Sequence, residues 1–147
     1  MTATISSEAQ RIFAEAPFIK DLGAKLESLS PGHCESSLVL ARRHLQQDGF
    51  VHAGVQATLA DHTAGAAGAT LVGDGKIVLS IAFQMNLLRA ALGERLVCRA
   101  NVLRAGRRVC AVESEVFVVQ AGQETLASKA TVTLAVLPVR SAEDAPK

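Results

Sequence analysis

The feature that most limits how this chain folds is a stretch of twenty-five residues, 49–73, with a single formally charged residue, Asp61. Its sequence is GFVHAGVQATLADHTAGAAGATLVG, in which alanine and glycine predominate. Such small residues let a neighbouring backbone approach closely, which suits a helix held against a tightly curved sheet. We therefore predict a buried central helix over residues 53–72, ended by the Gly-Asp-Gly sequence at 73–75.

The composition indicates one domain that associates with copies of itself. A chain of 147 residues is long enough for one core, and we expect a single domain over residues 1–147. Apolar residues make up 49% of the chain and its mean hydropathy is +0.26. Because one small domain hides little apolar area by itself, this excess favours burial between subunits.

Several functional classes are excluded by charge and patterning. A net charge of +1 leaves no electrostatic footprint for nucleic acid. The segment 53–72 contains Gln56, Asp61 and His62, so it suits a buried helix better than a membrane span. The first residues, MTATISSEAQRIF, lack the basic start and apolar run of a signal peptide. Three cysteines without CxxC spacing indicate a reducing, cytoplasmic compartment.

The remaining pattern predicts a sheet that surrounds the helix, and hence the α+β class. A short helix is expected within residues 1–16, ended by Pro17, and a frayed tail over 138–147. Apolar residues occupy every odd position from Ile77 to Leu87, so we expect them on one face, opposite Ser80. The strands are predicted as a pair within residues 22–40, around a turn at 30–32, and as a four-strand meander over 76–87, 96–103, 108–120 and 124–136.

Asp61 is the residue most indicative of chemistry. A carboxylate in an uncharged helix costs free energy unless it is paired, hydrogen-bonded or protonated, so it marks either a reactive group or a satisfied structural one. His52 lies nine positions before it. No metal or cofactor site is predicted, because His44, His52, Asp61 and His62 lack the spacing of a ligand set and no nucleotide-binding fingerprint is present.

Two segments carry a family resemblance. Residues 16–69 and the sequence SIAFQMNLLRAA at 80–91 resemble the PaaI-type acyl-CoA thioesterases of the hotdog fold. That family has an Asn or Gln, then HGG, then an acidic helical residue nine positions after the His, and a strand that ends LRPA. The likeness runs from about residue 17 to residue 136. The chain departs from the pattern at Ala53, where the family has glycine, and at Ala90, where it has proline.

The resemblance implies a role for each matching residue. Asp61 would be the catalytic carboxylate, acting on the thioester as a general base through water or as a nucleophile. Gln46 would orient the thioester or the water, with Gln47 as the alternative for that role. Ser80 would help to hold the hydrolytic water, and His52 would position the start of the helix.

Backbone amides complete the implied site. The N–H groups of Ala53 and Gly54, at the helix N-terminus, would hold the oxyanion that develops on the thioester oxygen. Arg89, Arg104, Arg107 and Arg108 lie near strand ends and are candidates for the phosphates of coenzyme A, with a solvated surface role as the alternative.

The expected activity is hydrolysis of an acyl-CoA, aryl or medium-chain, to free acid and coenzyme A, without a metal or cofactor. The expected assembly is a tetramer made of two dimers. Two alternatives stay open: an enoyl-CoA hydratase or dehydratase on the same fold, and a non-catalytic acyl-CoA-binding module. The first is disfavoured because His62, directly after Asp61, points about 100° away from it. The second is disfavoured because a buried carboxylate weakens apolar binding.

Overall fold

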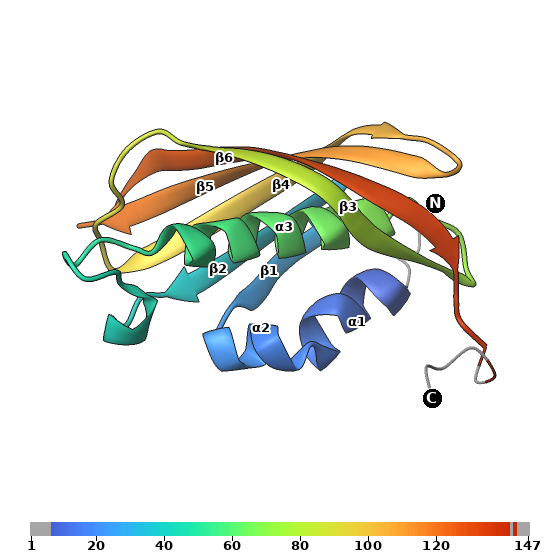
Figure 1. Cartoon of the computed structure of the whole chain (residues 1–147), viewed down its shortest axis with the longest axis horizontal. Coiled ribbons are helices and arrows are strands. Elements are labelled where there is room, and N and C mark those ends of the chain that lie inside the picture. The colour runs from blue at the N-terminus through green and yellow to red at the C-terminus, as the bar shows by residue number, and fades with distance from the viewer. Residues whose placement is uncertain (1–6, 142, 144–147) are drawn as a thin grey trace.

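The computed structural model describes residues 7–141 and 143. One antiparallel sheet curves over a central helix, and two short helices cover the side of that helix turned away from the sheet (Figure 1). The predicted α+β architecture is confirmed. The elements are α1 (Ser7–Glu15), α2 (Pro17–Leu22), β1 (Lys25–Ser30), β2 (His33–Val39), η1 (Arg42–His44), α3 (Ala53–Ala69), β3 (Lys76–Leu87), β4 (Arg95–Ala105), β5 (Val109–Gln120) and β6 (Gln123–Pro138).

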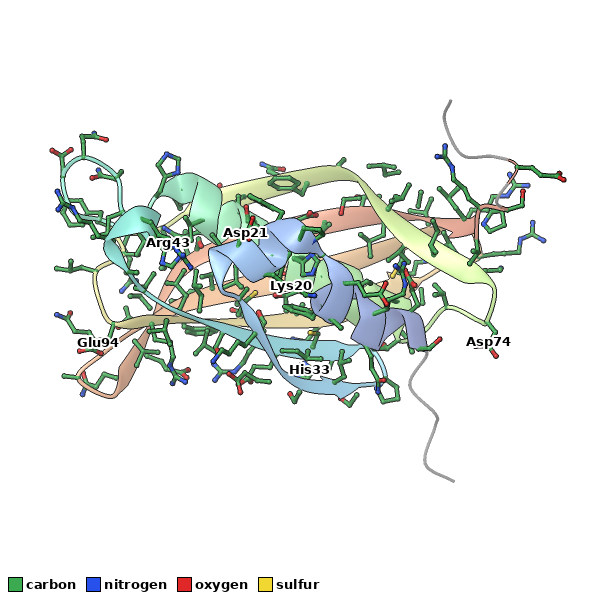
Figure 2. The ribbon with its side chains drawn as sticks, turned by 90° about the horizontal axis from the view of Figure 1, so that it is seen from below. Lys20, Asp21, His33, Arg43, Asp74 and Glu94 are labelled. Carbon is green, nitrogen blue, oxygen red and sulfur yellow. The ribbon has the colours of Figure 1, made fainter. Side chains whose placement is uncertain are left out.

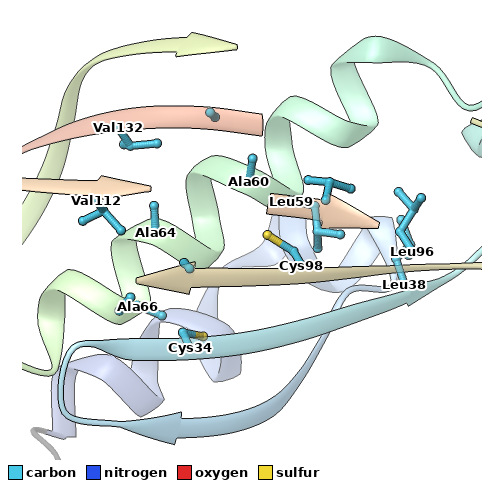
Figure 3. Close-up of a cluster of buried hydrophobic side chains, with 14 of the residues drawn as sticks. Cys34, Leu38, Leu59, Ala60, Ala64, Ala66, Leu96, Cys98, Val112 and Val132 are labelled. Carbon is cyan, nitrogen blue, oxygen red and sulfur yellow. The ribbon is translucent and has the colours of Figure 1, made fainter. Parts of the chain in front are cut away.

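The central helix α3 is held close to the sheet because its inner side chains are small. Ala60, Ala64 and Ala66 are buried and turn toward the valines and cysteines of the strands (Figure 3). At Gly68 a Cβ atom would overlap a methyl carbon of the buried Leu134 side chain on β6, so a larger residue would require this leucine to shift. The helix ends at Ala69, three residues earlier than predicted.

Buried hydrogen bonds fix how α3 is rotated about its axis. The Ser114 hydroxyl of β5 donates to the carbonyl oxygen of Ala60 at 2.8 Å. The Ser128 hydroxyl of β6 donates to the side-chain oxygen of Gln56, also at 2.8 Å. Because a buried polar group without a partner is costly, these bonds specify one rotation of the helix. That rotation determines where Asp61 points.

The predicted meander of the last four strands is wrong. The strand order is β1-β2-β4-β5-β6-β3, so β3 pairs with β6 and lies at an edge, while β4 pairs with β2 and β5. The alternation within a strand sets which side chains share a face but does not specify the neighbouring strand.

The predicted apolar face of β3 is also wrong, because the strand contains a β-bulge. Ser80 lies opposite Leu134 and Ala82 lies opposite Thr133, which leaves Ile81 as the extra residue. The bulge reverses the alternation: Ser80 before it and Phe83 after it both lie on the helix side of the sheet. Ile81, 60% exposed, is left on the edge of the sheet.

The N-terminal region contains a helix that the sequence did not reveal. Pro17 ends α1 as predicted, but it also occupies the first turn of α2, where its fixed φ is favourable. The strand expected from residue 22 therefore begins at Lys25. Ile19 is buried, while Lys20 and Asp21 lie in the helix layer at the surface (Figure 2).

The C-terminal strand is longer than predicted. β6 continues to Pro138, which pairs with Lys76, so the start of the expected frayed tail is a paired strand. Residues 142 and 144–147 of that tail, and residues 1–6 of the expected N-terminal helix, lie outside the described residues.

The three cysteines are buried free thiols, and we predict that they do not react while the protein is folded. Burial raises the pKa of Cys34 and of Cys98 to about 12, and it also raises the pKa of Cys110. At pH 8 the thiolate fraction of the first two is then on the order of 10⁻⁴. Titration with a thiol-reactive dye should detect no fast reaction in buffer and all three thiols in urea. Fast modification of the folded protein would contradict this assignment.

Candidate active site

The site is centred on a carboxylate that the sheet edge holds in place. Asp61 lies in the middle of α3 and is half-buried. The Ser80 hydroxyl of β3 donates a hydrogen bond to its Oδ1 atom at 2.6 Å. Among the described residues no basic side chain forms an ion pair with Asp61. The second carboxylate oxygen is therefore available to water or to a ligand.

Two cavities meet at Asp61 and at its neighbour His62. The first, which we call the α2–α3 cavity, measures about 310 Å³ and is lined chiefly by Ala16, Phe18, Ile19, Ala57 and Phe83. The second, the β3 cavity, measures about 300 Å³ and is lined chiefly by Ile12, Gly65, Val78, Leu79, Ser80 and Leu134. Both are largely apolar, so the carboxylate borders spaces suited to a hydrocarbon group.

His52 caps the N-terminus of α3. Its Nδ1 atom accepts a hydrogen bond from the Gly54 amide at 2.8 Å. A Cβ atom at position 54 would lie 3.0 Å from that nitrogen, which explains the glycine. The Gly54 amide is thus already engaged. The Ala53 amide has no acceptor within the part of the chain that the structure describes. Of the two amides singled out in the sequence, Ala53 offers the available donor.

Gln46 lies near this helix start. It is half-buried and lines a third cavity, of about 360 Å³, together with Ala53 and Arg89. Its side-chain oxygen accepts a hydrogen bond from the Asp48 amide. The neighbouring Gln47 is exposed and its amide donates to the Asp48 carboxylate at 3.1 Å. The geometry therefore favours Gln46 over Gln47 as the residue that meets a ligand beside Ala53.

His44 supports the helix start, a role that the sequence did not predict. It is buried, its Nδ1 accepts from the Ala41 amide at 2.9 Å, and its Nε2 donates to the Leu22 carbonyl at 2.8 Å. Its own carbonyl accepts from the backbone amide of His52 at 2.9 Å. The side chain of Arg43 also reaches the Leu22 carbonyl, at 3.0 Å, beside the end of α2 (Figure 2). A histidine in a polar loop gives no sequence signal for such a role.

The structure brings the predicted site residues together in two groups. Asp61 and Ser80 form one, and Gln46, His52 and Ala53 form the other. Ala53 and Asp61 are eight positions apart on the helix, which corresponds to about 12 Å along the axis. One carbonyl group cannot contact both within a single chain.

Other site types find no support in the described part of the chain. No group of three His, Cys, Asp or Glu side chains is arranged to hold a metal ion there. None of its helices is long and apolar enough to cross a membrane. Arg104, Arg107 and Arg108 line a separate cavity at the turn between β4 and β5.

Comparison with known proteins identifies the family. Residues 48–125, which include His52, Ala53, Asp61 and Ser80, match the thioesterase superfamily. The chain belongs to this superfamily. Its fold is the hotdog fold expected from the resemblance.

Relatives of known structure cover nearly the whole chain. A thioesterase family protein from Silicibacter pomeroyi is 32% identical, with a TM-score of 0.87 over 90% of this chain and 97% of that one. A phenylacetic acid degradation-related protein from Ralstonia eutropha JMP134 is 27% identical, with a TM-score of 0.74 over 88% and 99%. A curated Haemophilus influenzae protein that carries an esterase name is 25% identical over 91 residues, which span 62% of this chain and 66% of that relative.

His62 should make stability depend on pH. Burial lowers its pKa, against the opposing effects of its hydrogen bond to the Ile12 carbonyl at 3.0 Å and of the Asp61 charge. Its ring also packs edge-on against Phe13, with the centroids 4.6 Å apart. The folded protein thus keeps His62 neutral below pH 6.5, where the unfolded chain binds a proton. Its contribution is complete above pH 6.5 and is lost as the pH falls toward the lowered native pKa.

Substitution of His62 by glutamine isolates this effect, since glutamine does not titrate and retains a donor for Ile12. The free energy of unfolding in urea, measured at pH 7.5 and pH 5.5, should fall more steeply for the wild type than for His62→Gln. Equal changes in the two proteins would show that His62 does not contribute.

Proposed function

We propose that this protein hydrolyses acyl-CoA thioesters to a free acid and coenzyme A. The observation that carries the proposal is Asp61, a carboxylate held by the Ser80 hydroxyl at the meeting point of two apolar cavities, in a chain of the thioesterase superfamily. Its second oxygen either takes a proton from an attacking water or attacks the thioester carbon itself. In both cases the carbon–sulfur bond breaks, and coenzyme A leaves as a thiolate that takes up a proton.

The helix N-terminus supplies the second half of the chemistry in this proposal. The Ala53 amide, at the positive end of the helix dipole, stabilises the oxyanion that forms when the carbonyl carbon is attacked. Gln46 orients the thioester, and His52 positions the helix start by occupying the Gly54 amide. The substitution of glycine by Ala53 retains the N–H group, so the chemistry is preserved.

The proposed site is shared between two subunits. The separation of about 12 Å along α3 favours a thioester held between Asp61 of one chain and the partner subunit's Ala53. The edge strand β3 carries exposed apolar side chains, with Leu79, Ile81 and Leu87 each at least half exposed. Such an edge is suited to pairing with a second copy. We propose a dimer joined at this edge with its helices side by side, and two such dimers in a tetramer.

The substrate class in this proposal comes from the family resemblance. We propose an aryl or medium-chain acyl-CoA, which agrees with the phenylacetic acid label of the Ralstonia relative. The three buried free thiols suit a reducing cytoplasm, and no nucleic acid or membrane partner is proposed.

Substitution of Asp61 by asparagine should remove most hydrolysis and leave the fold intact. The side chain keeps its size but can neither accept a proton nor attack, which typically costs on the order of 10²–10⁴-fold in turnover. Release of coenzyme A from an acyl-CoA panel, followed with a thiol-reactive dye, measures the effect. Asp74→Asn is the matched control, because Asp74 is exposed in the turn after α3 (Figure 2). Near-normal turnover in Asp61→Asn would refute the catalytic role.

Two inactive variants should restore activity when they share a dimer. Ala53→Pro removes the proposed oxyanion donor at the first helical position, where proline is favoured and where the extended His52 before it is compatible. By itself it should lose about 10²–10³-fold in turnover. In a dimer with an Asp61→Asn subunit, one of the two shared sites is intact.

Co-expression of the two variants with different tags gives a random mixture of dimers, and the two tags show that mixed dimers have formed. A random mixture should recover about a quarter of the wild-type activity, since half of its dimers are mixed and each has one intact site. Mixed dimers that form but stay inactive would show that each chain carries its own complete site. Light scattering of the wild type measures the oligomeric state.

A further inference from the structure

We propose that Gln56 is a positioning residue for the reaction, because its side chain holds the peptide segment that presents the Ala53 amide. The inference rests on the proposed function and adds a residue that takes no direct part in the chemistry. Gln56 lies on α3, three residues after Ala53 and thus on the same side of the helix. Its long side chain can therefore lean back toward the helix start.

The side chain of Gln56 is buried, at 2% exposed, and is hydrogen-bonded at both ends of its amide. Its Oε1 atom accepts from the Ser128 hydroxyl of β6 at 2.8 Å, and its Nε2 atom donates to the Val51 carbonyl at 3.4 Å. Val51 is itself only 4% exposed, and no backbone amide of the described residues donates to its carbonyl. Gln56 is thus the donor on which this buried carbonyl depends.

The Ala53 amide needs this support because, among the described residues, it has no acceptor of its own. Its direction is set instead by the bonds of the segment that precedes it. The amides of Val51 and His52 each donate to a backbone carbonyl at 2.9 Å. The Val51 carbonyl lies between these two amides in the chain. Without Gln56 it would turn toward another donor, and the peptides that follow would move with it.

Such a movement matters because an oxyanion donor acts only from a closely defined position. A displacement of about 1 Å in an active site can lower the rate about 10²-fold. Gln56 therefore influences the reaction through the Ala53 amide, without contact to the thioester. Both groups belong to the same chain, so this role does not depend on how two subunits meet.

Substitution of Gln56 by methionine tests the role, since methionine keeps the length and the unbranched shape but forms neither hydrogen bond. It should lower kcat by about 10–100-fold and change KM by less than about twofold, because the lost stabilisation is that of the transition state. The readout is thiol release from octanoyl- and benzoyl-CoA.

The matched control is Ser36→Ala. It also removes a buried hydrogen bond between the sheet and α3, the bond at 2.6 Å between the hydroxyls of Ser36 and Thr63. It should lower the midpoint of urea unfolding, as Gln56→Met does, but leave kcat within about twofold of the wild type.

A second variant guards against misfolding. In Gln56→Met the hydroxyl of Ser128 stays buried without its partner, and Ser128→Ala removes that hydroxyl as well. The double variant should therefore be more stable than Gln56→Met and have the same low kcat. Circular dichroism and urea unfolding check that each protein is folded.

Combination with Ala53→Pro separates positioning from direct contact. When the Ala53 amide is already absent, Gln56→Met has nothing left to misplace and should lower kcat by less than about twofold further. Losses that multiply in this double variant would overturn the inference, because Gln56, which borders the third cavity, would then act on the thioester independently.

The inference is also overturned if folded Gln56→Met and folded Ser36→Ala have equal kcat values. Normal turnover in Ala53→Pro would refute the oxyanion donor and with it the role of Gln56. A wild type that releases thiol from neither ester instead refutes the proposed function itself.

Discussion

The close contact between α3 and the sheet is the constraint on which the rest of the structure depends. Leu134 fills the space that a side chain at position 68 would need, and Ala64 is wholly buried, so the helix axis cannot move outward without opening a void. At this distance the hydroxyl groups of Ser114 and Ser128 reach polar atoms of the helix and fix its rotation. This packing turns Asp61 toward the edge strand, where Ser80 donates a hydrogen bond to it.

The local patterns of the sequence predict most elements, but not their partners. The spacing of small residues locates α3, and alternation locates the strands to within a few residues. The neighbour of β3 depends on pairing between residues that are 41 to 62 positions apart in the sequence, so a local pattern cannot predict it. The bulge at Ile81 also cannot be predicted from a local pattern. Its one extra residue reverses the alternation of the strand, so that Ser80 and Phe83 lie on the same face of the sheet. Pro17 has two structural roles, because it ends one helix and begins the next. Only the first role is predicted from the sequence.

The candidate site was predictable where a residue stands out by charge and unpredictable where its role depends on a hydrogen bond. Asp61 is identifiable because it is the lone charge in its segment. The amides of Ala53 and Gly54 differ because the Nδ1 atom of His52 accepts a hydrogen bond from Gly54 and not from Ala53. The support that His44 gives to His52 depends on a local contact with Ala41 and on a contact with Leu22, which lies 22 positions earlier in the chain. The roles of these residues depend on hydrogen bonds that exist only in the folded chain, so the sequence alone does not predict them.

The engagement of His62 separates the possible chemistries of the site. A hydratase requires an acid–base histidine able to reach a ligand beside the carboxylate. Here the Nε2 atom of His62 donates to the Ile12 carbonyl and the ring packs on Phe13, so the side chain serves the docking of α1. A pure binding module has no use for a carboxylate at the junction of two apolar cavities, because the charge costs desolvation free energy and gains no contact with a hydrocarbon. The hydrolysis that we propose uses the free oxygen of Asp61 and leaves the Nε2–H group of His62 on the Ile12 carbonyl. Since the Ala53 amide lies about 12 Å from Asp61 along the same helix, the hydrolysis that we propose would need a second subunit to bring the two groups to one thioester.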